Sequence, residues 1–155
     1  MKNKKPSVKR ITNKRARFDY ELGDSIMAGL VLTGAETKAL RLGHGHLRGA
    51  YVTVRNNELW LLNATITGFN GVKLDETEQT RSRKLLLKSR EIKGLLEAKK
   101  QGKSIIPTEL LTQGRYIKIR ISTGTGKKHY DKRESLKKRD QQRETNAAIK
   151  QHRDR

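Results

Sequence analysis

Apolar positions in the middle of the chain follow the two-residue period of strands, and they predict a mainly β fold. An apolar run with β-branched members covers residues 26–33, and an alternating stretch covers 50–55. Asn56 and Asn57 follow, and asparagine tolerates the positive φ of a tight turn. Residues 58–64 then return as the partner strand, which completes a first hairpin.

A second hairpin is predicted near the end of this apolar region. Residues 105–112 and 115–123 flank Gln113-Gly114, a typical turn pair. In the second of these strands, isoleucines at 117, 119 and 121 share one face, while Lys118 and Arg120 share the other with Tyr116. This pattern predicts a half-buried strand with a basic outer face.

Two helices interrupt the strands. Thr33 and Glu36 form a capping box, which predicts a helix that runs to Leu42 and ends at Gly43. The second helix begins after Ser89, ends near Gly102 and carries an apolar stripe. Short strands with helices inserted between them favour a small closed barrel with helices at its openings, and an oligonucleotide-binding barrel leads the candidates.

The net charge of the chain indicates the kind of partner that it binds. The chain has 155 residues and a formal net charge of +20, which indicates a polyanionic partner. It lacks an apolar run near the ~18 residues of a membrane span, and its basic start is followed by no apolar signal segment, so nucleic acid is favoured over a membrane. The absence of cysteine excludes disulfides and thiolate metal sites and fits a reducing cytoplasm.

The charge is also unevenly distributed, which predicts three parts. These are a flexible basic N-terminal arm at 1–12, an RNA-binding barrel domain at 13–123 and a basic C-terminal tail at 124–155. Gly124-Thr125-Gly126 is expected to end the last strand.

The tail has helix-forming residues but no apolar stripe to dock it on the barrel. Asp131 can cap a helix, and Glu134 can pair with Lys138 one turn later. One interpretation is a disordered, solubilising tail. The favoured one is a segment that is disordered when free and folds as a helix when an RNA surface neutralises its charge.

Dense basic clusters are the best candidates for function. They lie at 13–17, 81–84 and 127–128, and Lys118 and Arg120 add a basic strand face. Lys and Arg contacts to phosphates supply affinity without sequence choice. Three aromatic residues beside the clusters could stack on unpaired bases, although barrel core is an equal alternative for the first two: Phe18, Tyr20 and Tyr130.

Other chemistry is weakly supported, and neither a metal nor a cofactor is expected. Residues 122–128 resemble a phosphate-binding loop, but position 121 is Ile where Gly is required, and position 128 is Lys where Ser or Thr is required. His44 and His46 lack an evident third metal ligand, and a cap explains Glu36. No catalytic arrangement is predicted.

Four ordered segments resemble the SmpB family, the small protein partners of tmRNA. The segments cover 13–20, 28–41, 80–87 and 126–134, and the similarity extends over nearly the whole chain from about residue 10. The resemblance implies a six-stranded antiparallel oligonucleotide-binding barrel with two or three helices. It also implies a non-catalytic adaptor that binds the tRNA-like domain of tmRNA and delivers it to stalled ribosomes for trans-translation in the cytoplasm.

The resemblance assigns residues to two RNA partners. Contacts with tmRNA are expected from Asn13, Lys14, Arg15, Arg17, Tyr20, Lys38, Arg41, Arg81, Arg83, Lys84, Leu86, Lys127 and Lys128. Contacts with small-subunit rRNA, in the A site and mRNA channel, are expected from Tyr130, Asp131, Lys132 and Arg133. The sequence departs from the family at Met27, where Glu is usual, so neighbouring contacts must compensate.

Two other functions share the basic composition. An rRNA-binding structural protein of the ribosome would carry similar arms, and an enzyme acting on RNA is a third, weaker hypothesis. The free protein is expected to be a monomer, since the sequence indicates no oligomer interface.

Overall fold

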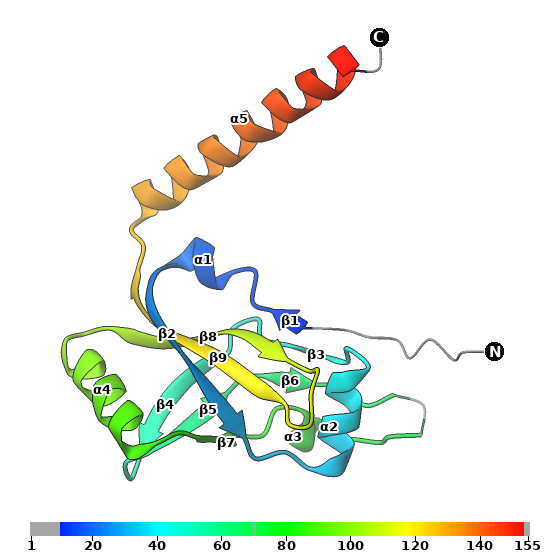
Figure 1. Cartoon of the computed structure of the whole chain (residues 1–155), viewed down its shortest axis with the longest axis vertical. Coiled ribbons are helices and arrows are strands. Elements are labelled where there is room, and N and C mark those ends of the chain that lie inside the picture. Colours follow the sequence, from blue (N-terminus) through cyan, green and yellow to red (C-terminus); the bar gives the residue numbers. More distant parts are fainter. Residues whose placement is uncertain (1–9, 70, 154–155) are drawn as a thin grey trace.

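The computed structural model describes residues 10–69 and 71–153, which form a barrel with a long helix standing clear of it (Figure 1). The strands are β1 (Arg10–Thr12), β2 (Tyr20–Leu30), β3 (Gly45–His46), β4 (Tyr51–Arg55), β5 (Glu58–Leu62), β6 (Thr65–Ile66), β7 (Arg83–Leu86), β8 (Ser104–Leu111) and β9 (Lys118–Gly126). The helices are α1 (Ala16–Asp19), α2 (Gly34–Arg41), α3 (Glu76–Gln79), α4 (Ser89–Lys100) and α5 (His129–Arg153).

Antiparallel pairing closes the barrel. The order is β8-β4-β5-β7-β2-β9, and β9 pairs back onto β8 along most of its length. This ring confirms the predicted six-stranded antiparallel barrel. β1 joins β8 as a seventh strand outside the ring, and β3 pairs with β6 separately.

The core lies inside the ring and follows the alternation of its strands. Ile119 and Ile121 of β9 are fully buried against Leu59 and Leu61 of β5, and Ala28 of β2 completes this layer. The basic residues that alternate with these isoleucines on β9 are exposed. The predicted half-buried strand with a basic outer face is therefore confirmed.

Both predicted hairpins are confirmed. Asn56 and Asn57 connect β4 to β5 with φ of 51° and 60°, and Arg55 lies opposite Glu58. Positive φ at both turn residues matches the right-handed twist of the strands that a two-residue turn connects. The second hairpin joins β8 to β9 through a turn in which Gly114 has φ of 95°.

The capping box at the start of α2 is confirmed. Thr33 Oγ1 accepts a hydrogen bond from the Glu36 amide at 3.2 Å, and the Thr33 amide donates to Glu36 Oε2 at 2.9 Å. α2 ends before Gly43, whose φ of 86° stops the helix. In the described part of the chain there are five helices rather than the predicted two or three, because α1 and α3 are four-residue turns and the tail is helical.

Several strand boundaries differ from the sequence prediction. β2 begins at Tyr20 rather than residue 26, and β7 was not predicted as a strand. The expected break at 124–126 is wrong, since these residues continue β9 and pair with β2 from Leu22 to Tyr20. A Cβ at Gly124 would lie 3.1 Å from the Glu21 carbonyl oxygen, so this glycine permits close strand packing and does not end the strand.

The folded body begins earlier than residue 13. Arg10–Thr12 form β1 and pair with Glu109–Leu111 of β8. These residues of the predicted N-terminal arm therefore belong to the sheet, and residues 1–9 of the arm lie outside the described residues.

Candidate nucleic-acid interface

A short segment before β2 carries the first basic cluster. Asn13 anchors it, because its Nδ2 donates to the Pro107 carbonyl at 2.9 Å and its backbone amide donates to the Thr108 carbonyl at 2.7 Å. Asn13 is 8% exposed, so its amide group holds the segment on β8 and is not presented to a ligand. Lys14, Arg15 and Arg17, which were predicted to bind RNA, are exposed beside it.

Open grooves lie on both sides of this segment. The first, of about 770 Å³, is lined by more cations than acids: Arg10, Lys14, Arg17, Arg120 and Lys127 against Glu21 and Glu109. The second, of about 450 Å³, adds residues that the sequence analysis missed: Tyr51, Lys99 and Lys103. Tyr51 lies in β4, Lys99 near the end of α4 and Lys103 in the loop after it. Closure of the barrel brings them close to α1, and their spacing in the sequence does not indicate this proximity. Tyr20 lines both grooves, where a base could stack.

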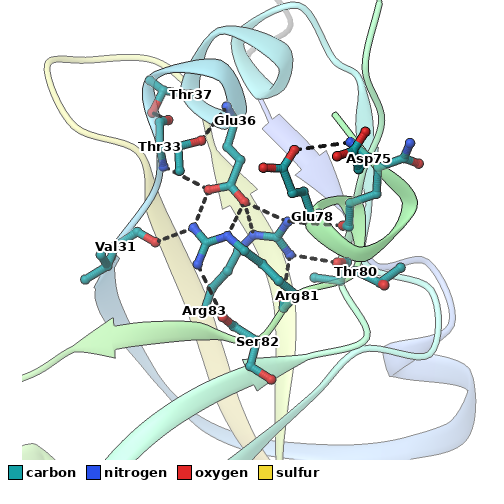
Figure 2. A network of polar contacts seen from close by, with 12 residues as sticks. Val31, Thr33, Glu36, Thr37, Asp75, Glu78, Thr80, Arg81, Ser82 and Arg83 are labelled. Atoms are coloured by element: carbon teal, nitrogen blue, oxygen red, sulfur yellow. Dashed lines mark hydrogen bonds and ion pairs between the residues drawn. The ribbon is translucent and has the colours of Figure 1, made fainter. Parts of the chain in front are cut away.

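The second basic cluster surrounds one buried carboxylate, that of Glu36 in α2 (Figure 2). Arg81 binds it with two nitrogens, Nε to Oε1 at 2.8 Å and Nη2 to Oε2 at 2.6 Å. Arg83 adds a third bond from its Nε to Oε1 at 2.9 Å. Burial opposes ionisation of Glu36, but the bonds from Arg81 and the Thr33 amide and the charge of Arg83 together lower its pKa.

Arg83 has structural contacts, and its predicted contact with RNA would require a buried side chain to become exposed. Its side chain is 0% exposed. Besides its hydrogen bond to Glu36, the Arg83 guanidinium donates four hydrogen bonds to backbone carbonyls, those of Ala64, Arg81, Glu78 and Gln79. Burial lowers the pKa of Arg83 and the Glu36 charge opposes this shift, yet a guanidinium remains ionised at neutral pH.

Arg81 differs from Arg83 because its side chain is 33% exposed. Glu36 therefore fixes one guanidinium at the surface and buries the other. Lys84 pairs with Glu58 on the neighbouring strand and stays partly exposed, while Leu86 is 52% exposed.

The exposed face of α2 adds two more predicted cations. Lys38 and Arg41 are both exposed. Arg41 Nη2 donates to the carbonyls of Gly114 and Arg115, each at 3.0 Å, and so fixes the β8–β9 turn beside α2. The other two guanidinium nitrogens of Arg41 make no hydrogen bond to the described residues.

β2 connects the two clusters. α1 precedes it directly and α2 follows it, so its eleven residues separate the clusters by roughly 30 Å. β9 lies beside β2 and places Lys118 opposite Gly29 and Arg120 opposite Met27. The basic strand face thus continues from one cluster to the other.

Met27, where the resemblance predicts Glu, lies on this path. Its cross-strand neighbour Arg120 pairs with Glu109 of β8 at 2.5 Å, and Glu109 also pairs with Arg10. A carboxylate of β8 therefore neutralises part of the charge of the cross-strand neighbour of Met27.

The tail residues form α5, and none of its residues is buried. Tyr130 is 64% exposed and Arg133 is exposed. Asp131 lies within the first turn, where it accepts a hydrogen bond from the Lys128 amide at 3.3 Å, so it does not occupy the cap position itself. The predicted pair of Glu134 with Lys138 is present at 3.4 Å on the helix surface.

Two of the tail's cations contact α1. Lys127 Nζ donates to the Arg17 carbonyl at 2.9 Å, and its amide donates to the Asp19 carbonyl at 2.9 Å. Lys132 Nζ lies 3.3 Å from Asp19 Oδ1. Lys128 is exposed between them.

Other chemistry gains no support from the geometry. His44 stacks on Phe69 with ring centroids 4.9 Å apart, and no group of three or more metal-binding side chains occurs among the described residues. Residues 122–126, which resembled a phosphate loop, lie in strand β9. No helix within the described ranges is long and apolar enough to cross a membrane.

Comparison with known proteins gives consistent matches. The family model described as "SmpB protein" matches residues 10–151. An SsrA-binding protein of Trichormus variabilis is 39% identical over 155 residues, covering 98% of this chain and 100% of the relative. One from Lacticaseibacillus casei is 40% identical over 147 residues, covering 94% of each chain.

A solved structure gives a match in three dimensions. It is described as "tmRNA-SmpB: a journey to the center of the bacterial ribosome". The TM-score is 0.66 at 31% identity, and the match covers 79% of this chain and 87% of the other.

Proposed function

This chain belongs to the SmpB family, and on that premise we propose that it binds the tRNA-like domain of tmRNA and delivers it to stalled ribosomes for trans-translation. The observation that carries the proposal is the separation of its cations. One set lies along β2 on a rigid barrel, and the other lies on a polar helix that stands clear of it (Figure 1).

The barrel is the proposed binding surface for tmRNA. Its exposed or partly exposed cations, from the α1 cluster to α2 and β7, are Lys14, Arg15, Arg17, Lys38, Arg41, Arg81, Lys84, Lys127 and Lys128. Tyr20 between its two grooves supplies a ring for stacking. Asn13 and Arg83 act indirectly, because the first holds the α1 segment and the second holds Glu36 in place under Arg81.

The tail is the proposed contact with small-subunit rRNA. α5 has 25 residues and is about 37 Å long at about 1.5 Å per residue, which suits an extended channel such as the empty mRNA path. Tyr130, Asp131, Lys132 and Arg133 form its first turn and a half and would act in the decoding centre. We propose that this tail is disordered in the free protein and helical on the ribosome, since a helix with polar residues on every side is weakly stable alone.

The proposed role is non-catalytic and belongs in the cytoplasm, where the ribosome works. The competing function is a stoichiometric rRNA-binding protein of the ribosome. Such a protein would remain on ribosomes through a salt wash and would equal them in abundance, whereas an adaptor would be substoichiometric.

Sequencing the RNA that co-purifies with the full chain separates these functions. We expect one small stable RNA with a tRNA-like end to be enriched over ribosomal RNA. Recovery of ribosomal RNA alone would refute the adaptor.

A truncation separates the roles of barrel and tail. A chain that ends at Lys128 keeps all of β9, whereas one that ends at Thr123 would remove residues that pair with β2. We expect the Lys128 chain to bind tmRNA like the full chain and to fail in peptide tagging in a reconstituted translation system. Loss of tmRNA binding by this chain would place the tail in the primary RNA site and contradict the assignment.

A further inference from the structure

The base of α5 contacts the body at α1. Lys127 contributes two hydrogen bonds to carbonyls of α1, and Lys132 contributes an ion pair. Past Lys132, the described residues of α5 have hydrogen bonds and ion pairs only with other residues of α5, such as Glu134 with Lys138. The direction of a 25-residue helix is therefore set by a small junction at its base.

Phe18 and Asp19 form the centre of this junction, and each serves two cations. Asp19 Oδ1 lies 3.3 Å from Lys132 Nζ, and Asp19 Oδ2 lies 3.5 Å from Arg15 Nε. The Phe18 ring has the same two neighbours, with Arg15 Cζ and Lys132 Nζ each 5.9 Å from its centroid. Distances near 6 Å lie within the range of cation–π attraction.

These partners are more enclosed than ordinary surface pairs. The side chains of Asp19 and Lys132 are 28% and 30% exposed, while that of Arg15 is 57% exposed. Arg15 is thus open to a phosphate, whereas Asp19 and Lys132 are held against the body. The junction links a cation expected to bind tmRNA with a cation expected to bind rRNA.

We propose that Phe18 and Asp19 are positioning residues that set the direction in which α5 leaves the barrel, and that Arg15 and Lys132 compete for them. The inference rests on the proposed function and deepens it, because it gives Asp19 a role beside the RNA site and gives Phe18 one in place of stacking on an unpaired base. A phosphate that binds Arg15 would draw it away from Asp19. Lys132 would then lose a like charge beside it and would no longer share the Asp19 carboxylate with Arg15. Binding of the tRNA-like domain then fixes the tail more firmly, which couples the two RNA sites.

Spin-label distances in the full chain test the positioning role. The chain has no cysteine, so cysteines introduced at Arg55, an exposed residue of β4, and at Gln142 in α5 are its only labelling sites. We expect binding of the tRNA-like domain to narrow the distance distribution of the parent chain, and Asp19→Asn and Phe18→Leu to reduce this narrowing. Glu134→Gln, which removes an ion pair on the exposed surface of α5, is the matched control and should leave the distribution unchanged.

Three outcomes overturn the positioning role. The first is a distribution for Asp19→Asn that matches the control. The second is a distribution for Lys132→Gln that matches the control, because Lys132 is the α5 residue through which Phe18 and Asp19 would act. The third is a distribution in the parent chain that fails to narrow when the tRNA-like domain binds. Unchanged Trp60 fluorescence verifies that each variant is folded. If Phe18→Leu is not folded, Asp19→Asn alone tests the positioning role.

Functional assays distinguish positioning from direct RNA contact. Asp19→Asn should bind tmRNA within about twofold of the parent, because no phosphate contact is lost, and should reduce tagging by about two- to fivefold, as loss of one modest ion pair allows. Weak tmRNA binding by this variant would make Asp19 part of the RNA site and overturn its positioning role. If the parent itself bound no tmRNA, the proposed function would fail, while the distances would still report on the junction.

Discussion

Replacing Glu36 by Gln tests the account of the buried carboxylate. Gln keeps the shape of Glu and one acceptor oxygen, but it leaves the Arg83 guanidinium, which is 0% exposed, without a counter-charge. Removing one partner of a buried ion pair costs about 3–5 kcal/mol of unfolding free energy. We expect about 3 kcal/mol for Glu36→Gln, since Arg83 keeps its four carbonyl partners.

Urea unfolding followed by the fluorescence of Trp60, the single tryptophan, measures this cost. The matched control is Glu58→Gln. Glu58 pairs with Lys84, which directly follows Arg83 in sequence, but the side chains of Glu58 and Lys84 are 42% and 36% exposed, so the change should cost less than about 1 kcal/mol. Equal costs for the two variants would refute the argument that burial makes the Glu36 network essential.

A double replacement of Glu36 and Arg83 by Met should not restore stability, because four backbone carbonyls would lose their donor; recovery to within about 1 kcal/mol of the parent in the same urea titration would contradict this. The lowered pKa of Glu36 means that its contribution is present above the unfolded-state pKa, about 4.5, and is lost as pH falls through the lower folded-state pKa. The stability gap between parent and Glu36→Gln should therefore close in acid, and a gap that is constant to pH 2 would exclude this linkage. If about six phosphates are contacted, the affinity for tmRNA should fall roughly a thousandfold between 50 and 200 mM salt, and a flat filter-binding titration would argue against electrostatic binding. Amide hydrogen exchange in α5 should be much faster than in β2 and β9, because α5 has no buried residue; equal protection would show that the tail is docked.

Local signals in the sequence were sufficient wherever chemistry within a few residues decides the structure. The Thr33–Glu36 capping box, the Asn56–Asn57 turn and the alternating face of β9 all depend on neighbours in the chain, and all three are confirmed. The number of strands in the ring came from family resemblance and not from periodicity.

Arg83 shows where such reasoning fails. In the sequence it is one of three cations at 81–84, and nothing there separates it from Arg81. Only the barrel places Glu36 of α2 above β7, where it buries one guanidinium and leaves the other partly exposed. A buried cation in a basic cluster is invisible until its counter-charge, 47 residues away, is located.

Asn13 and Gly124 have structural roles that the sequence did not indicate, for a related reason. Asparagine in a basic cluster resembles an RNA ligand, and its amide group also binds the Pro107 carbonyl 94 residues away. Glycine near the end of a strand resembles a break, yet it admits the backbone of the neighbouring strand. In both cases the structural partner is distant in sequence, so local composition could not indicate it.

The three partners of β8 affect how the protein avoids association with itself. β9 occupies one side of this strand, so β4 and β1 divide the other, with β4 at Ile105 and β1 at Glu109–Leu111. Without β1, the second half of β8 would expose unpaired backbone amides and carbonyls, an edge onto which another copy could add a strand. The three residues of β1 therefore protect the barrel from edge-to-edge aggregation.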